Sequence, residues 1–135
     1  MNMNKEAERQ KEYIVFDGSK FVIEWYFDPN GKSYALDYFE QLNDNEQIKS
    51  LGLFALMGNM GEIKNKTKFN NEGDKIYAFK PQPHRFLCFF FAGGKIIVTN
   101  AFHKKTDKLP AGEKEIALKY KKDYETRVNR GNYYE

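Results

Sequence analysis

A chain of 135 residues can bury one hydrophobic core but not two, so a single domain spanning residues 1–135 is expected. Hydrophobic residues make up 41% of the chain and aromatic residues 16%, which excludes a disordered composition. The longest apolar run, residues 86–92, is far shorter than the roughly 20 residues of a membrane span. Residues 1–12 carry charges instead of an apolar signal region, so we expect a cytoplasmic protein with a flexible or weakly helical arm. The single cysteine, Cys88, lies in the apolar run and predicts a buried structural thiol.

The first half of the chain predicts two strands followed by two helices. Residues 13–16 and 21–27 are rich in β-branched and aromatic side chains and are joined by a short turn. A stripe at i, i+3, i+4 and i+7 then predicts an amphipathic helix, and it consists of Ala35, Tyr38, Phe39 and Leu42. A second helix is expected at residues 44–60, with Gly58 and Gly61 as its end signals.

The second half predicts three antiparallel strands and a closing helix. The strands are expected at residues 75–80, 85–91 and 95–103. The middle one is apolar on both faces, which favours a central strand covered on both sides. Pro110 opens a helix to about Val128, whose apolar stripe is Ile116, Tyr120, Tyr124 and Val128. This order predicts an α+β domain in which a small antiparallel sheet carries two N-terminal helices and one C-terminal helix.

Basic residues gather in the second half, although the net charge is only +3. Residues 1–79 carry 10 Lys and Arg against 13 Asp and Glu, whereas residues 80–130 carry 12 against 5. Such an asymmetry favours one face that binds a polyanion. The alternative is a lysine-rich helix whose charges are simply solvated.

An ordered set of residues accompanies the last three strands and the helix. The set is Lys80, Arg85, Phe102-His103-Lys104-Lys105-Thr106, Pro110, Ala117, Asp123-Tyr124 and Arg127. In these residues the chain resembles the RelE/ParE superfamily of bacterial toxins, and most closely the phage-type HigB toxins of type II toxin–antitoxin systems. It differs in having Lys80 where many relatives have arginine, and in lacking the histidine that follows the tyrosine in some HigB-type members.

The resemblance implies a RelE-like fold and a ribosome-dependent mRNA endonuclease. In this reaction the ribose 2′-OH attacks the neighbouring phosphate without a metal or other cofactor, so the enzyme must supply positive charge, a base and an acid. Arg85 is the expected phosphate clamp, and Lys80 a second cation whose pKa its cationic neighbours would lower. Tyr124 would stack on a base or donate a proton, while His84 and His103 are further acid–base candidates.

Five more cations are expected to contact RNA phosphates, namely Lys104, Lys105, Lys108, Lys121 and Arg127. Each candidate also has a plainer interpretation. Arg85 would pair with Glu72 or Asp74, Tyr124 would fill the core, and the lysines would be solvated. The two histidines have no acidic partner at ligand spacing, so no metal site is expected.

Two other functions fit the same resemblance. ParE-like members share the fold and poison DNA gyrase by binding, and an inert phage-derived domain would only bind its antitoxin. The Phe-x-Lys-Lys-Thr…Pro motif favours the HigB-type nuclease. Either toxin implies a cognate antitoxin from a neighbouring gene, a helix-turn-helix DNA-binding protein, and the nuclease also implies the ribosome and mRNA as partners.

Overall fold

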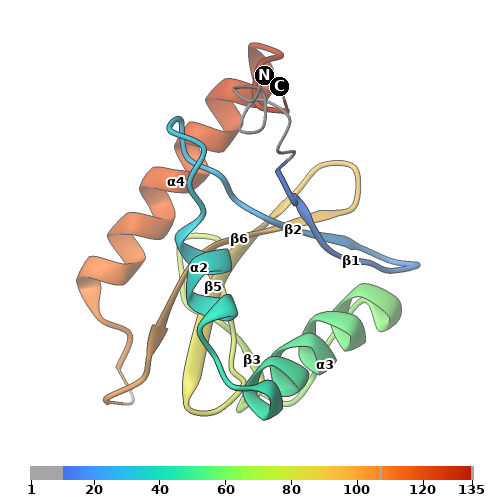
Figure 1. Ribbon diagram of the computed structural model, residues 1–135, viewed down its shortest axis with the longest axis vertical. Coiled ribbons are helices and arrows are strands. Elements are labelled where there is room, and N and C mark those ends of the chain that lie inside the picture. Colours follow the sequence, from blue (N-terminus) through green and yellow to red (C-terminus); the bar gives the residue numbers. More distant parts are fainter. Residues whose placement is uncertain (1–10, 107, 135) are drawn as a thin grey trace, which may run out of the picture.

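The computed structural model describes residues 11–106 and 108–134, so most of the predicted N-terminal arm lies outside the described residues. The elements are β1 (Ile14–Asp17), β2 (Val22–Trp25), α2 (Tyr34–Glu40), α3 (Asp44–Met60), β3 (Phe69–Asn71), β4 (Tyr77–Phe79), β5 (His84–Phe91), β6 (Lys95–His103) and α4 (Ala111–Asn129). The strands form one sheet in the order β1-β2-β6-β5-β4-β3 (Figure 1). The architecture is α+β, and no helix in the described ranges is long and apolar enough to span a membrane.

The sheet is mixed, and this corrects the predicted all-antiparallel sheet. β2 pairs with β6 in parallel, in a register that places Val22 opposite Lys95, while every other neighbouring pair is antiparallel. The parallel pair is possible because two helices and three strands separate β2 from β6 and carry the chain back across the sheet. The edge strand β3 was not predicted, because three residues that include two asparagines have little strand propensity.

The helices cover the two faces of the sheet separately, with α2 and α3 on one face and α4 on the other (Figure 1). Alternating residues of β5 serve the two cores. Phe86 and Cys88 pack toward α2 and α3, whereas Leu87 and Phe89 pack toward α4. The predicted central strand, covered on both sides, is confirmed. Cys88 is fully buried as predicted, and burial raises the pKa of its thiol.

Gly18 in the turn between β1 and β2 lies directly against Gly58 near the end of α3. Gly61 ends α3 in the left-handed conformation (φ 84°), but Gly58 lies inside the helix and is not an end signal. The backbone N–H groups of Lys20 and Phe21 donate to the Gly58 carbonyl at 2.7 and 2.9 Å. A Cβ on Gly18 would lie well under 3.0 Å from that same carbonyl group, so only glycine allows this approach.

The segment that follows α4 folds back against the sheet. Tyr133 is only 2% exposed, and its hydroxyl accepts a hydrogen bond from the backbone N–H of Phe27 at 2.9 Å. The hydroxyl of Tyr134 donates to the buried Glu24 at 2.7 Å and lies 2.6 Å from the hydroxyl of Tyr124. Neither Tyr133 nor Tyr134 belonged to a predicted element, yet Tyr133 completes the core beneath α4, and the more exposed Tyr134 is attached to it by these hydrogen bonds.

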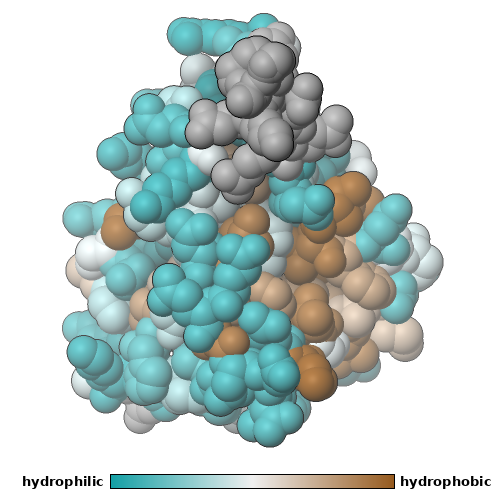
Figure 2. All heavy atoms as spheres, viewed as in Figure 1, coloured by the Kyte–Doolittle hydropathy of each residue, from teal (hydrophilic) through white to brown (hydrophobic). Residues whose placement is uncertain are grey.

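Hydrophobic side chains also reach the surface of α3. Figure 2 shows a mostly hydrophilic surface over α4 and hydrophobic residues gathered on the side of β1 and α3. Ile48, Leu56 and Met60 of α3 are exposed, whereas Phe54 and Met57 are buried. The helix therefore buries one face while remaining partly apolar on the other, as its nearly continuous apolar run 53–57 indicates.

Candidate functional site

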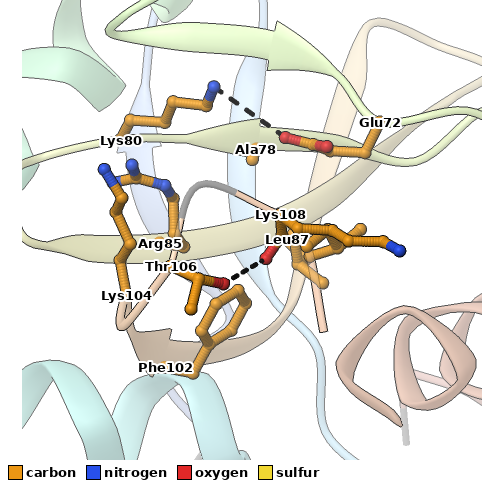
Figure 3. A pocket seen from close by; sticks show the side chains of 10 residues that line it. Glu72, Ala78, Lys80, Arg85, Leu87, Phe102, Lys104, Thr106 and Lys108 are labelled. Atoms are coloured by element: carbon orange, nitrogen blue, oxygen red, sulfur yellow. Dashed lines mark hydrogen bonds and ion pairs between the residues drawn. The ribbon is translucent and has the colours of Figure 1, made fainter. Parts of the chain in front are cut away.

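A small pocket opens where β4 ends, β5 begins and β6 ends, on the face covered by α4. It is lined by Glu72, Ala78, Lys80, Arg85, Leu87, Phe102, Lys104, Thr106, Lys108 and Leu109 (Figure 3). Four of these ten residues are basic and one is acidic. The enclosed space is about 20 Å³, which suits a water-sized group such as one phosphate oxygen. A larger ligand would have to bind across the mouth of the pocket.

Strand register explains why these residues meet. The turn at Pro81–Pro83 joins β4 to β5, so Lys80 and Arg85 stand at neighbouring strand ends. Arg85 pairs with Phe102 on β6, and the chain beyond β6 brings Lys104 and Lys108 to the same place. Figure 3 shows the side chains of Arg85 and Lys104 side by side with Lys80 close to them, while the ammonium group of Lys108 points away.

The environment of Lys80 favours loss of its proton. Its pKa is lowered from 10.5, first by burial and then by the charges of Arg85 and Lys104, while Glu72 opposes the shift. The predicted effect of neighbouring cations thus has the expected direction, although burial contributes more. The Nζ atom lies 3.9 Å from Glu72 Oε2 and donates to the carbonyl of Lys66 at 3.3 Å.

Arg85 is half-buried, and hydrogen bonds at its Nη1 atom help to orient it. Its Nη1 donates to Gln82 Oε1 at 3.2 Å and to the backbone carbonyl of His84 at 2.9 Å. Of the two acids considered as its partners, Glu72 lies near Lys80, and Asp74 forms an ion pair with Lys114 at 2.9 Å. The guanidinium group is therefore oriented at the pocket mouth before any ligand binds.

The structure places both predicted histidines on the opposite face of the sheet. His84 is 5% exposed, with Nδ1 2.7 Å from the hydroxyl of Tyr38 and Nε2 2.9 Å from Glu46 Oε2. Hydrogen bonds from His84 and from the backbone of Asn43 hold the pKa of Glu46 below its usual 4.5. His103 pairs with His84 across the strands and is exposed. Neither histidine lines the pocket that contains Arg85.

Tyr124 lies in the core beneath α4. Its ring packs against Phe89, Phe91 and Tyr133, and its side chain is fully buried. Burial raises the pKa of its hydroxyl to about 12, although the hydrogen bond with Tyr134 acts in the opposite direction. The structure therefore fits the plainer interpretation of this residue as a core side chain.

The two basic residues predicted on α4 also have structural partners. Arg127 contacts Asp123 at 2.6 Å, donates to the carbonyl of Phe27 and stacks on the ring of Tyr133. Lys121 pairs with Glu125 at 2.9 Å. It lies ten residues beyond the start of α4, or about 15 Å along the helix axis. These two residues and Tyr124 are not among the residues that line the pocket.

Of the ten predicted site residues, four line the pocket, namely Lys80, Arg85, Lys104 and Lys108. Lys105 lies on the other side of the loop, exposed, beside a separate hollow that Tyr38 and Glu113 also line. Glu72 was noted only as a possible partner of Arg85, because its position depends on the unpredicted strand β3. Within residues 11–106 and 108–134, no three His, Cys, Asp or Glu side chains form a group suited to a metal ion.

These features define a small α+β protein with a cationic pocket at one end of its sheet. The family model described as Phage derived protein Gp49-like (DUF891) matches residues 37–122, and the chain belongs to this family of RelE/HigB-like toxins. The matched region runs from α2 into α4 and includes the four basic residues of the pocket. No curated protein matches the chain.

Proposed function

We propose that this protein is the toxin of a type II toxin–antitoxin system and cleaves mRNA on the ribosome. The observation that carries the proposal is the convergence of Lys80, Arg85 and Lys104 on one pocket, in a family associated with such toxins. A cognate helix-turn-helix antitoxin from a neighbouring gene is part of the same proposal.

In this proposal, residues of the pocket supply the charge, the base and the acid that a metal-independent cleavage needs. The 2′-oxygen forms a bond to phosphorus as the bond to the 5′-oxygen breaks, which leaves a cyclic phosphate and a 5′-hydroxyl. Arg85 would hold two phosphate oxygens with its planar guanidinium group, and Lys104 would add a second charge. Lys80 and Glu72 are the titratable pair that would accept the proton of the 2′-hydroxyl and return one to the departing oxygen. The lowered pKa of Lys80 increases the fraction of neutral amine available for this role.

A gyrase inhibitor of the ParE type is the second candidate, and one observation favours it. His84, His103 and Tyr124 all lie outside the pocket, which leaves acid–base chemistry to Glu72 and the lysines among the described lining residues. A binding protein needs no such groups.

Expression without an antitoxin separates these functions. We expect induced bacteria to stop growing and primer extension on their transcripts to show cuts inside reading frames. Growth arrest with intact mRNA and broken chromosomes would instead support gyrase poisoning, and unimpaired growth would support an inert domain. Cells that express the Arg85→Ala variant, which lacks the proposed phosphate clamp, control for the burden of expression.

The neighbours Lys104 and Lys105 provide a matched test of the pocket. Lys104 lines it, and the backbone N–H of Lys104 donates to the carbonyl of Pro83 at 2.8 Å, which fixes its position. We expect Lys104→Ala to weaken RNA binding and to reduce the log–log salt slope by about 0.7, because one phosphate contact is lost. Lys105→Ala removes the same charge one residue away and should have a smaller effect. Titrations of both variants at several salt concentrations measure this, and equal losses would contradict a role for the pocket in selecting phosphate.

A further inference from the structure

A larger groove adjoins the pocket at Lys80. The pocket lies on the α4 side of the sheet, whereas the groove, of about 350 Å³, lies beside α3. Lys49 and Leu53 of α3 line it, together with Lys68 before β3 and Pro81 after β4. Lys80 lines both hollows, so a polymer bound at the mouth of the pocket would meet the groove beside Lys80.

Hydrogen bonds to backbone carbonyls hold the walls of the groove together. The backbone N–H of Lys80 donates to the carbonyl of Lys68 at 2.9 Å, and the side-chain Nε2 of Gln82 donates to the carbonyl of Thr67 at 3.2 Å. These bonds tie the segment before β3 to the end of β4. Lys68 and Lys80 are therefore presented at fixed positions beside Lys49 on α3.

The groove combines positive charge with an apolar surface. Three of its eight lining residues are lysines from three different segments, and none of the eight is acidic. Leu53 and Pro81 provide apolar contacts between these cations. Single-stranded nucleic acid presents the matching pattern, since charged phosphates alternate with the flat apolar faces of the bases. A volume of about 350 Å³ also falls in the range of pockets that hold small organic groups.

We propose that this groove binds the single-stranded RNA next to the cleaved phosphate. The phosphates of one or two flanking nucleotides would contact Lys49 and Lys68, and a base would pack against Leu53 and Pro81. This inference rests on the proposed function, and it adds the path of the RNA beyond the pocket. The groove offers lysines for the RNA backbone and an apolar lining from Leu53 and Pro81, so binding there is tolerant of base sequence.

Binding of RNAs of two lengths to the purified protein tests the groove. The probes are fluorescently labelled single strands, a dinucleotide that reaches only across the mouth of the pocket and an RNA of about 12 nucleotides that also reaches the groove. We expect the double variant Lys49→Ala with Lys68→Ala to bind the longer RNA more weakly, with a log–log salt slope reduced by about 1.4 for two lost phosphate contacts. Its binding of the dinucleotide should match that of the wild type.

The control is the double variant Lys119→Ala with Lys122→Ala, which makes the same change in net charge on exposed positions of α4. If the two double variants bind the longer RNA equally and their melting temperatures are unchanged, the inference that the groove binds RNA is overturned. That result leaves the proposed function standing if expression still produces cuts in mRNA. Groove-dependent RNA binding without mRNA cleavage in cells would support the groove as an RNA-binding site and contradict the proposed nuclease function. Loss of binding to a poly-glutamate peptide but not to RNA would assign the groove to an acidic protein segment and also overturn the inference.

Discussion

Replacing Arg85 by alanine is expected to lower the rate of mRNA cleavage by about 10²–10³-fold, as the removal of a preorganised transition-state donor typically does. The hydrogen bonds to Gln82 and to the carbonyl of His84 orient the guanidinium group in the unbound protein. Binding therefore requires little reordering of the side chain, and the charge is in place when the phosphorane forms. The side chain is half-buried at a strand end, so alanine removes little core packing.

Single-turnover cleavage of mRNA on purified ribosomes measures this effect, with the melting temperature recorded for each variant. Arg85→Lys keeps the charge but loses the planar fork, so its rate should fall between those of wild type and Arg85→Ala. Arg127→Ala is the matched structural control, because that arginine joins Asp123 to the carbonyl of Phe27 within the fold. It should lower the melting temperature without a specific loss of rate in the folded protein. An Arg85→Ala variant that cleaves at the wild-type rate would remove Arg85 from the site.

The largest expected effect on stability is at Gly18. Gly18→Ala should lower the free energy of unfolding by about 3 kcal/mol, at the upper end of the usual cost of overpacking. The added methyl group would collide with the backbone of Gly58. Neither side can yield easily, because the Gly58 carbonyl accepts the hydrogen bonds from Lys20 and Phe21 that dock the β1–β2 turn on α3.

Gly52→Ala is the natural comparison, since this glycine lies in the middle of α3 and a methyl group there would meet nothing within 4 Å. Alanine should stabilise the protein there by up to about 1 kcal/mol through helix propensity alone. Urea unfolding of the two variants and the wild type gives both differences. Similar stabilities for Gly18→Ala and Gly52→Ala would show that the turn moves away from α3 at little cost.

The helices and the longest strands could be predicted from the sequence where the signals are local. The predicted bounds of α3 and β6 match the structure, since Asn43 caps α3 and Gly61 ends it, while a turn containing Gly93 and Gly94 starts β6. The parallel pairing of β2 with β6 could not be predicted in this way. It depends on partners far apart in the chain, and no local pattern specifies them.

In the candidate site, too, some positions could be predicted from local sequence signals and others could not. Lys80, Arg85 and Lys104 follow or begin neighbouring strands, so the antiparallel order alone brings them together. His84 immediately precedes Arg85, and the alternation of side chains along a strand sends the two to opposite faces. That separation follows from the two-residue period of a strand, so it could have been predicted from the sequence. The position of Glu72 could not be predicted, because it depends on the short strand β3.

The strand pairs of the sheet fall into two groups that differ in sequence separation, and the parallel contact between β2 and β6 marks the boundary between them. β4, β5 and β6 pair across short turns, and they carry Lys80, Arg85 and the approach to Lys104. β1 and β2 reach the sheet only by closing a loop of about 70 residues, from Val22 to Lys95. The cationic pocket thus belongs to the locally connected part of the sheet, and the long-range contact bears on global stability more than on pocket geometry. Sequence changes in β1 and β2 can therefore alter the free energy of unfolding while the spacing of the pocket cations stays the same.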